Sequence, residues 1–140
     1  MKDMIYLASG LDLVDQVRDV ARRLAHYQDV EIVSSWHDGH APPAHLIKVD
    51  KESSGDEIAI QCLSEIDGCD VLIGILGSAR YGHIAEIFYA LGKGKRVYTV
   101  LANGLTSWHI PTILLNHPHI GKLGVIDEWL KDVPLVWSEK

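Results

Sequence analysis

Glu86 is the residue whose type and position best suit it to chemistry. It follows an apolar run at residues 71–76 and a glycine-containing turn, and it lies in the first turns of a predicted helix. The apolar stripe of that helix, Ile84, Ile87 and Leu91, lies on a different face, so Glu86 can face a crevice at the end of the preceding strand. A carboxylate there can act as a nucleophile, an acid or a base. The alternative interpretation is that an acidic residue near a helix start only complements the helix dipole.

Two further turns could bind an anion or a substrate. Ser9 and Gly10 precede Asp12, which opens a predicted helix, and the backbone N–H groups of such a turn can hold a carboxylate or a phosphate. This turn lacks the glycine pattern of a dinucleotide site or a P-loop. A loop with glycine and prolines, 36–43, follows the second predicted strand, and long loops in compact domains are usually functional.

Eight histidines raise the question of a metal site. Six of them fall in two loops: His37, His40, His45, His109, His117 and His119. Their spacing matches no metal motif and no carboxylate or cysteine cluster accompanies them, so we expect surface histidines, no metal and no cofactor. Cys62 and Cys69 fit no zinc or redox motif, and we expect reduced thiols.

The hydrophobic pattern alternates between strands and helices. It predicts strands at residues 5–8, 30–34, 71–76 and 96–101. It predicts helices that open at Asp12, at Ser54 as the N-cap of a capping box, and near Ile84, with a short last helix at 126–130 and a packed tail at 135–137. Such alternation implies right-handed parallel crossovers. We therefore expect residues 1–140 to form a single α/β domain, a doubly wound, flavodoxin-like three-layer sandwich with a mostly parallel sheet of four to five strands.

Composition limits the partners of the chain. Of its 140 residues, 47% are hydrophobic, and 19 acidic residues outnumber 13 scattered basic ones, a globular profile that does not suit a nucleic-acid polymer. No stretch reaches the roughly 18 to 20 apolar residues that span a bilayer, and the N-terminus runs into a strand without a signal-peptide core. We expect a cytoplasmic protein that binds neither a nucleic-acid polymer nor a membrane.

An ordered set of short motifs covers most of the chain. These motifs are Ile5-Tyr6-Leu7-Ala8-Ser9, Val33-Ser34-Ser35-Trp36, Asp67-Gly68-Cys69-Asp70-Val71-Leu72-Ile73, Gly82, Glu86, Ala90-Leu91, Gly94-Lys95-Arg96-Val97 and Asn116-His117-Pro118-His119-Ile120. No single motif is decisive, but the order is fairly specific. In this order the chain resembles the nucleoside 2-deoxyribosyltransferase superfamily, which includes N-hydrolases of nucleoside 5′-monophosphates.

The resemblance implies cleavage or transfer at the N-glycosidic bond of a nucleoside or nucleoside 5′-monophosphate. Glu86 would attack the anomeric carbon to form a covalent glycosyl-enzyme, as in retaining glycosidases, and water or a second base would resolve it. Tyr6 would orient the carboxylate or the sugar. The substrate-binding positions that the resemblance implies are Ser9, Gly10, Ser34, Ser35, Trp36, Arg80, Gly82 and His83. It also implies a homodimer, for which Trp108 and Phe88 are the apolar surface candidates.

Three positions differ from the pattern of that family. Cys62 stands where family members commonly carry an aspartate, Arg80 where the transferases carry another, and Phe88 where a glycine is usual. A thiol cannot replace a carboxylate as an acid or a sugar-binding group, whereas Arg80 could receive a phosphate. The alternative function is therefore a catalytically silent nucleotide-binding module of the same fold.

Overall fold

The computed structural model describes residues 2–38, 52–77, 81–104 and 112–133. Within these ranges a single parallel sheet has the strand order β2-β1-β3-β4-β5. The strands are β1 (Asp3–Ser9), β2 (Val30–Ile32), β3 (Val71–Leu76), β4 (Arg96–Leu101) and β5 (Ile120–Val125). This is the strand order of flavodoxin-like doubly wound folds, in which ligands bind beyond the carboxyl ends of the strands.

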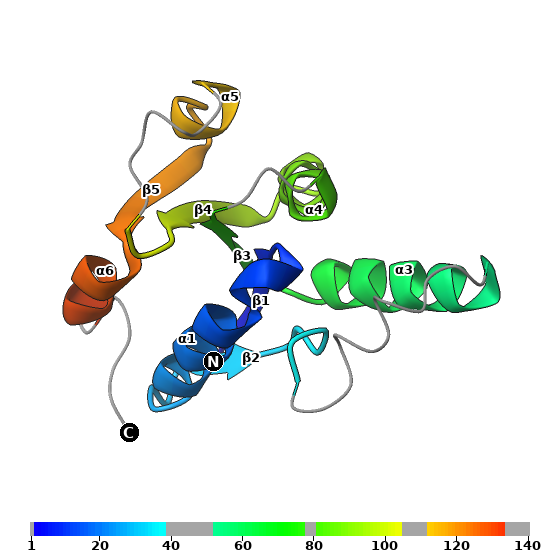
Figure 1. Ribbon diagram of the computed structural model, residues 1–140, viewed down its shortest axis with the longest axis horizontal. Helices are drawn as coiled ribbons and strands as arrows, with labels where there is room; N and C mark the ends of the chain where they lie inside the picture. Colours follow the sequence, from blue (N-terminus) through cyan, green and yellow to red (C-terminus); the bar gives the residue numbers. More distant parts are fainter. Residues whose placement is uncertain (1, 39–51, 78–80, 105–111, 134–140) are drawn as a thin grey trace.

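Helices cover both faces of the sheet (Figure 1). A 3₁₀ turn, η1 (Leu11–Leu13), leads into α1 (Val14–Leu24), which shares one face with α6 (Ile126–Asp132). The opposite face carries α3 (Glu52–Asp67), α4 (Tyr81–Gly92) and the short α5 (Thr112–Leu115). Among the described residues, no helix is both long and apolar enough to cross a bilayer.

The sheet separates two hydrophobic cores, and β1 contributes to both of them. Ile5 and Leu7 pack on the α1 and α6 side, whereas Tyr6 and Ala8 pack on the α3 and α4 side. This alternation follows from the period of two along a strand. All six residues of β3 are buried, because helices cover both faces of a central parallel strand. Tyr6 therefore points into the same layer as α4, which carries Glu86.

The predicted α/β architecture is confirmed, with corrections to individual elements. The second strand ends at Ile32 rather than at Ser34. Ser54 is the third residue of α3 rather than its N-cap, because Glu52, a good helix former, extends the helix before the capping-box pattern. The fifth strand, β5, was not predicted, since its two glycines and Lys122 interrupt the apolar pattern of this edge strand. The predicted tail at 135–137 lies outside the described residues.

Gly74 in β3 lets α4 lie close to the sheet. A Cβ atom at Gly74 would lie 2.6 Å from Cδ1 and 3.0 Å from Cγ1 of Ile87, distances at which one of the groups must move. Ile87 is fully buried and is the neighbour of Glu86 in the helix. The absence of a side chain at Gly74 therefore sets the height of α4 above β3 and with it the position of Glu86.

We predict that Gly74→Ala lowers the free energy of unfolding by about 1–3 kcal/mol, because the added methyl group overpacks this contact. Gly92→Ala is the matched control, since a Cβ there meets no atom within 4 Å. Urea denaturation of the two variants measures the difference. Equal stability of both variants would show that Ile87 moves aside without cost.

Candidate active site

Tyr6 and Glu86 meet between the sheet and α4. They are 80 residues apart in the chain, and the Tyr6 hydroxyl donates a hydrogen bond to Oε2 of Glu86. Tyr6 lies in the middle of β1 and is fully buried, and Glu86 lies in the second turn of α4. Within the described residues this is the only hydrogen bond of the Glu86 carboxylate. Its other oxygen, Oε1, has no protein donor among them.

Burial is the main influence on the Glu86 carboxylate. It raises the pKa of Glu86 from 4.5 to about 7, because a charged group loses its hydration between the sheet and the helices. The Tyr6 hydrogen bond acts in the opposite direction, and the negative charge of Glu65 adds to the increase. Near neutral pH, Glu86 is therefore divided between its charged and neutral forms, a property that often marks functional carboxylates.

The Tyr6 hydroxyl and the Cys62 thiol, which both interact with Glu86, are neutral groups. Burial, followed by the charge of Glu86, raises the pKa of Tyr6, so its hydroxyl stays protonated and remains a donor. The Cys62 thiol of α3 interacts with that hydroxyl, and burial raises the pKa of Cys62. Cys62 is therefore a neutral thiol rather than a reactive thiolate. Cys62 and Cys69 are both free cysteines, as predicted.

A second carboxylate, that of Glu65, lies near Tyr6 and Glu86 and was not among the site residues predicted from the sequence. Its Oε1 accepts a hydrogen bond from the Ser35 backbone N–H at 3.0 Å, and its Oε2 accepts one from the Ser35 hydroxyl. Gln61 donates a third hydrogen bond to Oε2 at 2.7 Å. The available sequence signal was the spacing of Cys62 and Glu65, which places them three residues apart on one face of α3.

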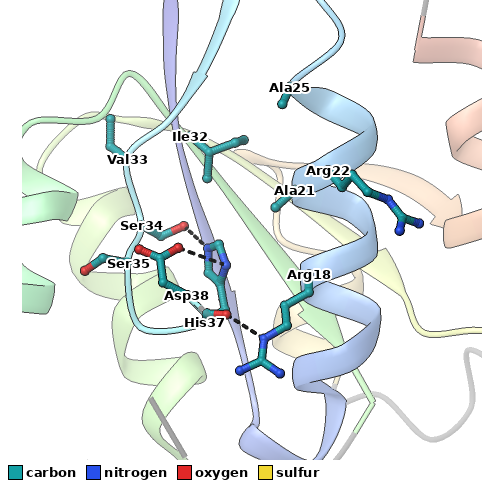
Figure 2. A pocket seen from close by; sticks show the side chains of 10 residues that line it. All are labelled: Arg18, Ala21, Arg22, Ala25, Ile32, Val33, Ser34, Ser35, His37 and Asp38. Carbon is teal, nitrogen blue, oxygen red and sulfur yellow. Dashed lines mark hydrogen bonds and ion pairs between the residues drawn. The ribbon is translucent and has the colours of Figure 1, made fainter. Parts of the chain in front are cut away.

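The segment 33–38, which follows β2, is divided between the two faces of the sheet. The Ser34 hydroxyl accepts a hydrogen bond from the Leu7 N–H at 3.1 Å and bonds Nε2 of His37 at 2.7 Å. Figure 2 shows this pair directed toward α1, whereas the Ser35 side chain points away from α1. The Trp36 indole donates to the Leu7 carbonyl at 2.6 Å, which anchors the ring to β1. The Ser34 and Ser35 side chains therefore point to different sides of this segment, although both residues line the cavity on its α1 side.

A cavity of about 390 Å³ lies on the α1 side of this segment (Figure 2). Its walls include the apolar Ala21, Ile32 and Val33, with Arg18 and Arg22 from α1. Nε of Arg18 already donates to the His37 carbonyl at 2.7 Å, and Arg22 forms an ion pair with Asp19. Because its cations are engaged within the fold, this cavity is a weaker candidate for chemistry than the Glu86 site.

Two histidines are buried: His37, predicted to be a surface histidine, and His83, predicted to bind substrate. His37 is 3% exposed and holds Ser34, which corrects its assignment as a surface histidine. His83, in the first turn of α4, is 2% exposed, and its Nδ1 makes no hydrogen bond with the described residues. Burial lowers the pKa of both imidazoles, so both are neutral near pH 7, although Asp12 partly opposes this effect at His83. His117 and His119 lie nearer the surface.

The remaining predicted site residues either make contacts within the fold or lie outside the described residues. The Ser9 hydroxyl donates to the Ile75 carbonyl at 2.8 Å, so this side chain fixes the end of β1 to β3. Gly10 accepts a hydrogen bond from the Leu13 N–H, which closes the turn into α1. Gly82 lies within the first turn of α4 rather than in the preceding turn. Arg80 lies outside the described residues, as do His40, His45, Trp108 and His109.

The arrangement of Tyr6 and Glu86 suits attack by a carboxylate. Within the ranges that the structure describes, no group of three or more histidine, cysteine, aspartate or glutamate side chains could hold a metal ion. Glu86 instead offers one oxygen held by a phenol and a second oxygen without a protein donor. A carboxylate of this kind can attack an electron-poor carbon or accept a proton.

The raised pKa of Glu86 gives a prediction for stability. The folded protein holds this proton more tightly than the unfolded chain does, so stability is lost as the pH rises from 4.5 through about 7. We expect Glu86→Gln, which stays neutral, to be more stable than the native protein by up to about 3 kcal/mol at pH 8, and by little near pH 4.5. Thermal and urea denaturation across this range measure the difference. The control is Glu31→Gln at an exposed position of β2, and a constant offset at every pH would contradict the burial argument.

Removal of the Tyr6 hydroxyl gives a second prediction. Because its hydrogen bond favours the charged carboxylate, Tyr6→Phe is expected to raise the pKa of Glu86 above about 7. A ¹³C NMR titration of glutamate carboxyl groups measures this, with the Glu86 signal assigned by its loss in Glu86→Gln. Tyr98→Phe is the control, since Tyr98 packs against the core on the α1 and α6 side. A Glu86 midpoint that stays the same in Tyr6→Phe would count against the hydrogen bond.

Comparisons with known proteins support the fold. No protein-family model matches the sequence, and no curated protein matches it. Solved structures do match, and one of them is the CMP N-glycosidase BcmB of Clostridium botulinum, with 16% sequence identity, a TM-score of 0.62, and coverage of 93% of this chain and 97% of that chain. The chain thus shares with that protein an α/β three-layer, flavodoxin-like fold built on a parallel sheet.

Proposed function

We propose that this protein cleaves or transfers at the N-glycosidic bond of a nucleoside or nucleoside 5′-monophosphate, with Glu86 as the nucleophile and Tyr6 assisting it. The observation that carries the proposal is the partly buried Glu86 carboxylate, with its raised pKa and, among the described residues, its single hydrogen bond from Tyr6. The fold shared with a CMP N-glycosidase supports the same class of reaction.

The proposed reaction has two steps. In the first, an oxygen of ionised Glu86 bonds to the anomeric carbon of the sugar as the C–N bond breaks, and the base leaves with the electron pair and takes a proton from water. In the second, water or another base attacks the same carbon and releases Glu86. Two nearby carboxylates, Glu86 and Glu65, would stabilise the positive charge that develops on the sugar in both steps.

Tyr6 would serve this reaction as a fixed donor. Its hydroxyl holds one oxygen of Glu86, so the other is oriented for attack. We further propose that Ser9, Gly10, Ser34, Ser35, Trp36, Arg80, Gly82 and His83 form the binding surface for base, sugar and phosphate. His83 is the member with a buried nitrogen that lacks a protein partner among the described residues.

The same proposal includes the domain organisation, the cellular location and the oligomeric state of the protein. Residues 1–140 would act as one domain in the cytoplasm, without a metal or cofactor, and as a homodimer. Phe88 is a poor candidate for the dimer surface, because it packs against its own core. Exposed apolar side chains occur instead at Ile60 and Leu63 of α3 and at Ile113 of α5. Light scattering measures the oligomeric state.

Release of free base tests the proposed reaction. We expect the protein to release base from at least one member of a panel of nucleosides and 5′-monophosphates that includes CMP, as measured by chromatography. Glu86→Gln should lower kcat/KM by roughly a thousand-fold or more. Because the nucleophile must be ionised, kcat/KM should fall as the pH drops through about 7. The control variant is Glu31→Gln, and release that persists in Glu86→Gln would exclude the assigned nucleophile.

The second candidate function is a catalytically silent nucleotide-binding module, favoured by the neutral thiol of Cys62 beside Tyr6. Calorimetric titration with the same panel separates the two functions. Saturable binding without base release would favour the module. Transfer of the sugar to a second added base would instead identify a transferase rather than a hydrolase.

A further inference from the structure

We propose that Glu65 is a positioning residue of the Glu86 site. Its side chain, on α3, holds Ser35 of the segment that follows β2, and it places a second negative charge near Glu86. The inference rests on the proposed function and deepens it. It assigns a role to a residue that neither the spacing of motifs nor the family resemblance identified.

Glu65 and the hydrogen bonds that it accepts from Ser35 and Gln61 form an arrangement that we call the clamp. Both of its oxygens bond Ser35, one through the backbone N–H and the other through the hydroxyl, and Gln61 supplies a third donor. Glu65 is only partly exposed, so these donors replace water that the carboxylate loses. A carboxylate with three donors remains an acceptor and cannot rotate freely toward another partner.

The clamp acts on a segment that is held from the other side as well. His37 bonds the Ser34 hydroxyl, and Arg18 from α1 donates to the His37 carbonyl. The Trp36 indole donates a hydrogen bond to the carbonyl of Leu7, which follows Tyr6 in β1. The segment 33–38 is therefore fixed between α1 and α3, and Glu65 supplies its attachment on the α3 side, where the Tyr6 and Glu86 pair lies.

Glu65 is also the charged neighbour of Glu86. The described groups that interact with Glu86 are Tyr6 from β1 and Cys62 and Glu65 from α3, and His83 lies one turn earlier in α4. Burial keeps Tyr6 and Cys62 protonated and His83 neutral. The charge of Glu65 therefore opposes ionisation of Glu86. It also favours states in which Glu86 has lost its charge by bonding to the sugar.

Two substitutions separate the clamp from the charge. Glu65→Gln removes the charge and keeps the size of the side chain, whereas Ser35→Ala removes one hydroxyl contact and keeps the charge. Glu31→Gln, on exposed β2, is the matched control for loss of a glutamate charge. The readouts are the Glu86 titration by ¹³C NMR and hydrogen exchange of the Ser35 amide, neither of which requires turnover.

For Glu65→Gln we expect the Glu86 midpoint to move to lower pH by about half a unit or more, because a like charge is lost. The acidic limb of the kcat/KM profile should move in the same direction. The Ser35 amide should exchange about tenfold faster, since a neutral acceptor holds it less tightly. Ser35→Ala should leave the midpoint in place and raise KM. If Glu65→Gln fails to fold, Glu65→Asp should keep the midpoint near that of the native protein and still speed exchange at Ser35.

The outcomes distinguish this inference from the proposed function. An unchanged midpoint and unchanged exchange in Glu65→Gln would overturn the role of Glu65, even if base release depends on Glu86. A shifted midpoint in a protein that releases no base would support the coupling and overturn the proposed reaction alone. A loss of stability without either shift would show a purely structural side chain and would also overturn the inference.

Discussion

The site depends on one partly buried interaction, the hydrogen bond from the Tyr6 hydroxyl to the Glu86 carboxylate. Burial of a carboxylate costs free energy, and the protein offsets only part of it with one phenol. A guanidinium or ammonium partner would have stabilised the charge more strongly and would have lowered the pKa of Glu86. Because Tyr6 is neutral, the carboxylate keeps a high affinity for a proton and, by the same physics, for an electron-poor carbon.

The parallel sheet explains why this interaction forms between distant parts of the chain. Tyr6 lies on the face of β1 that faces α4, in register with Leu72 of β3. Gly74, on the same face of β3, allows Ile87 to approach the strand and so brings Glu86 down to the phenol. Close packing at a residue that does no chemistry therefore determines the distance between the two residues that are proposed to do it.

Much of the fold could be predicted, because β3 is a continuous buried run and β4 a mostly apolar one, with clear turns on either side. The edge strand β5 could not, since Gly121 and Gly124 remove the pattern. Glu86 could be proposed from its position in the helix after β3, whereas Tyr6 was identified only by resemblance. Glu65 was not predicted, although it lies three residues from Cys62 on α3, because its partner Ser35 cannot be recognised from the sequence.

Cys62 and Glu65 show how α3 distributes charge around Tyr6. A carboxylate at position 62 would compete with Glu86 for the single proton of the Tyr6 hydroxyl, since Cys62 already interacts with that group. The thiol does not compete, because it remains protonated, and Tyr6 continues to donate to Glu86. One turn along the same face, Glu65 carries a negative charge that Ser35 and Gln61 keep occupied. The site thus contains two carboxylates but leaves only Glu86 with an oxygen that lacks a protein donor among the described residues.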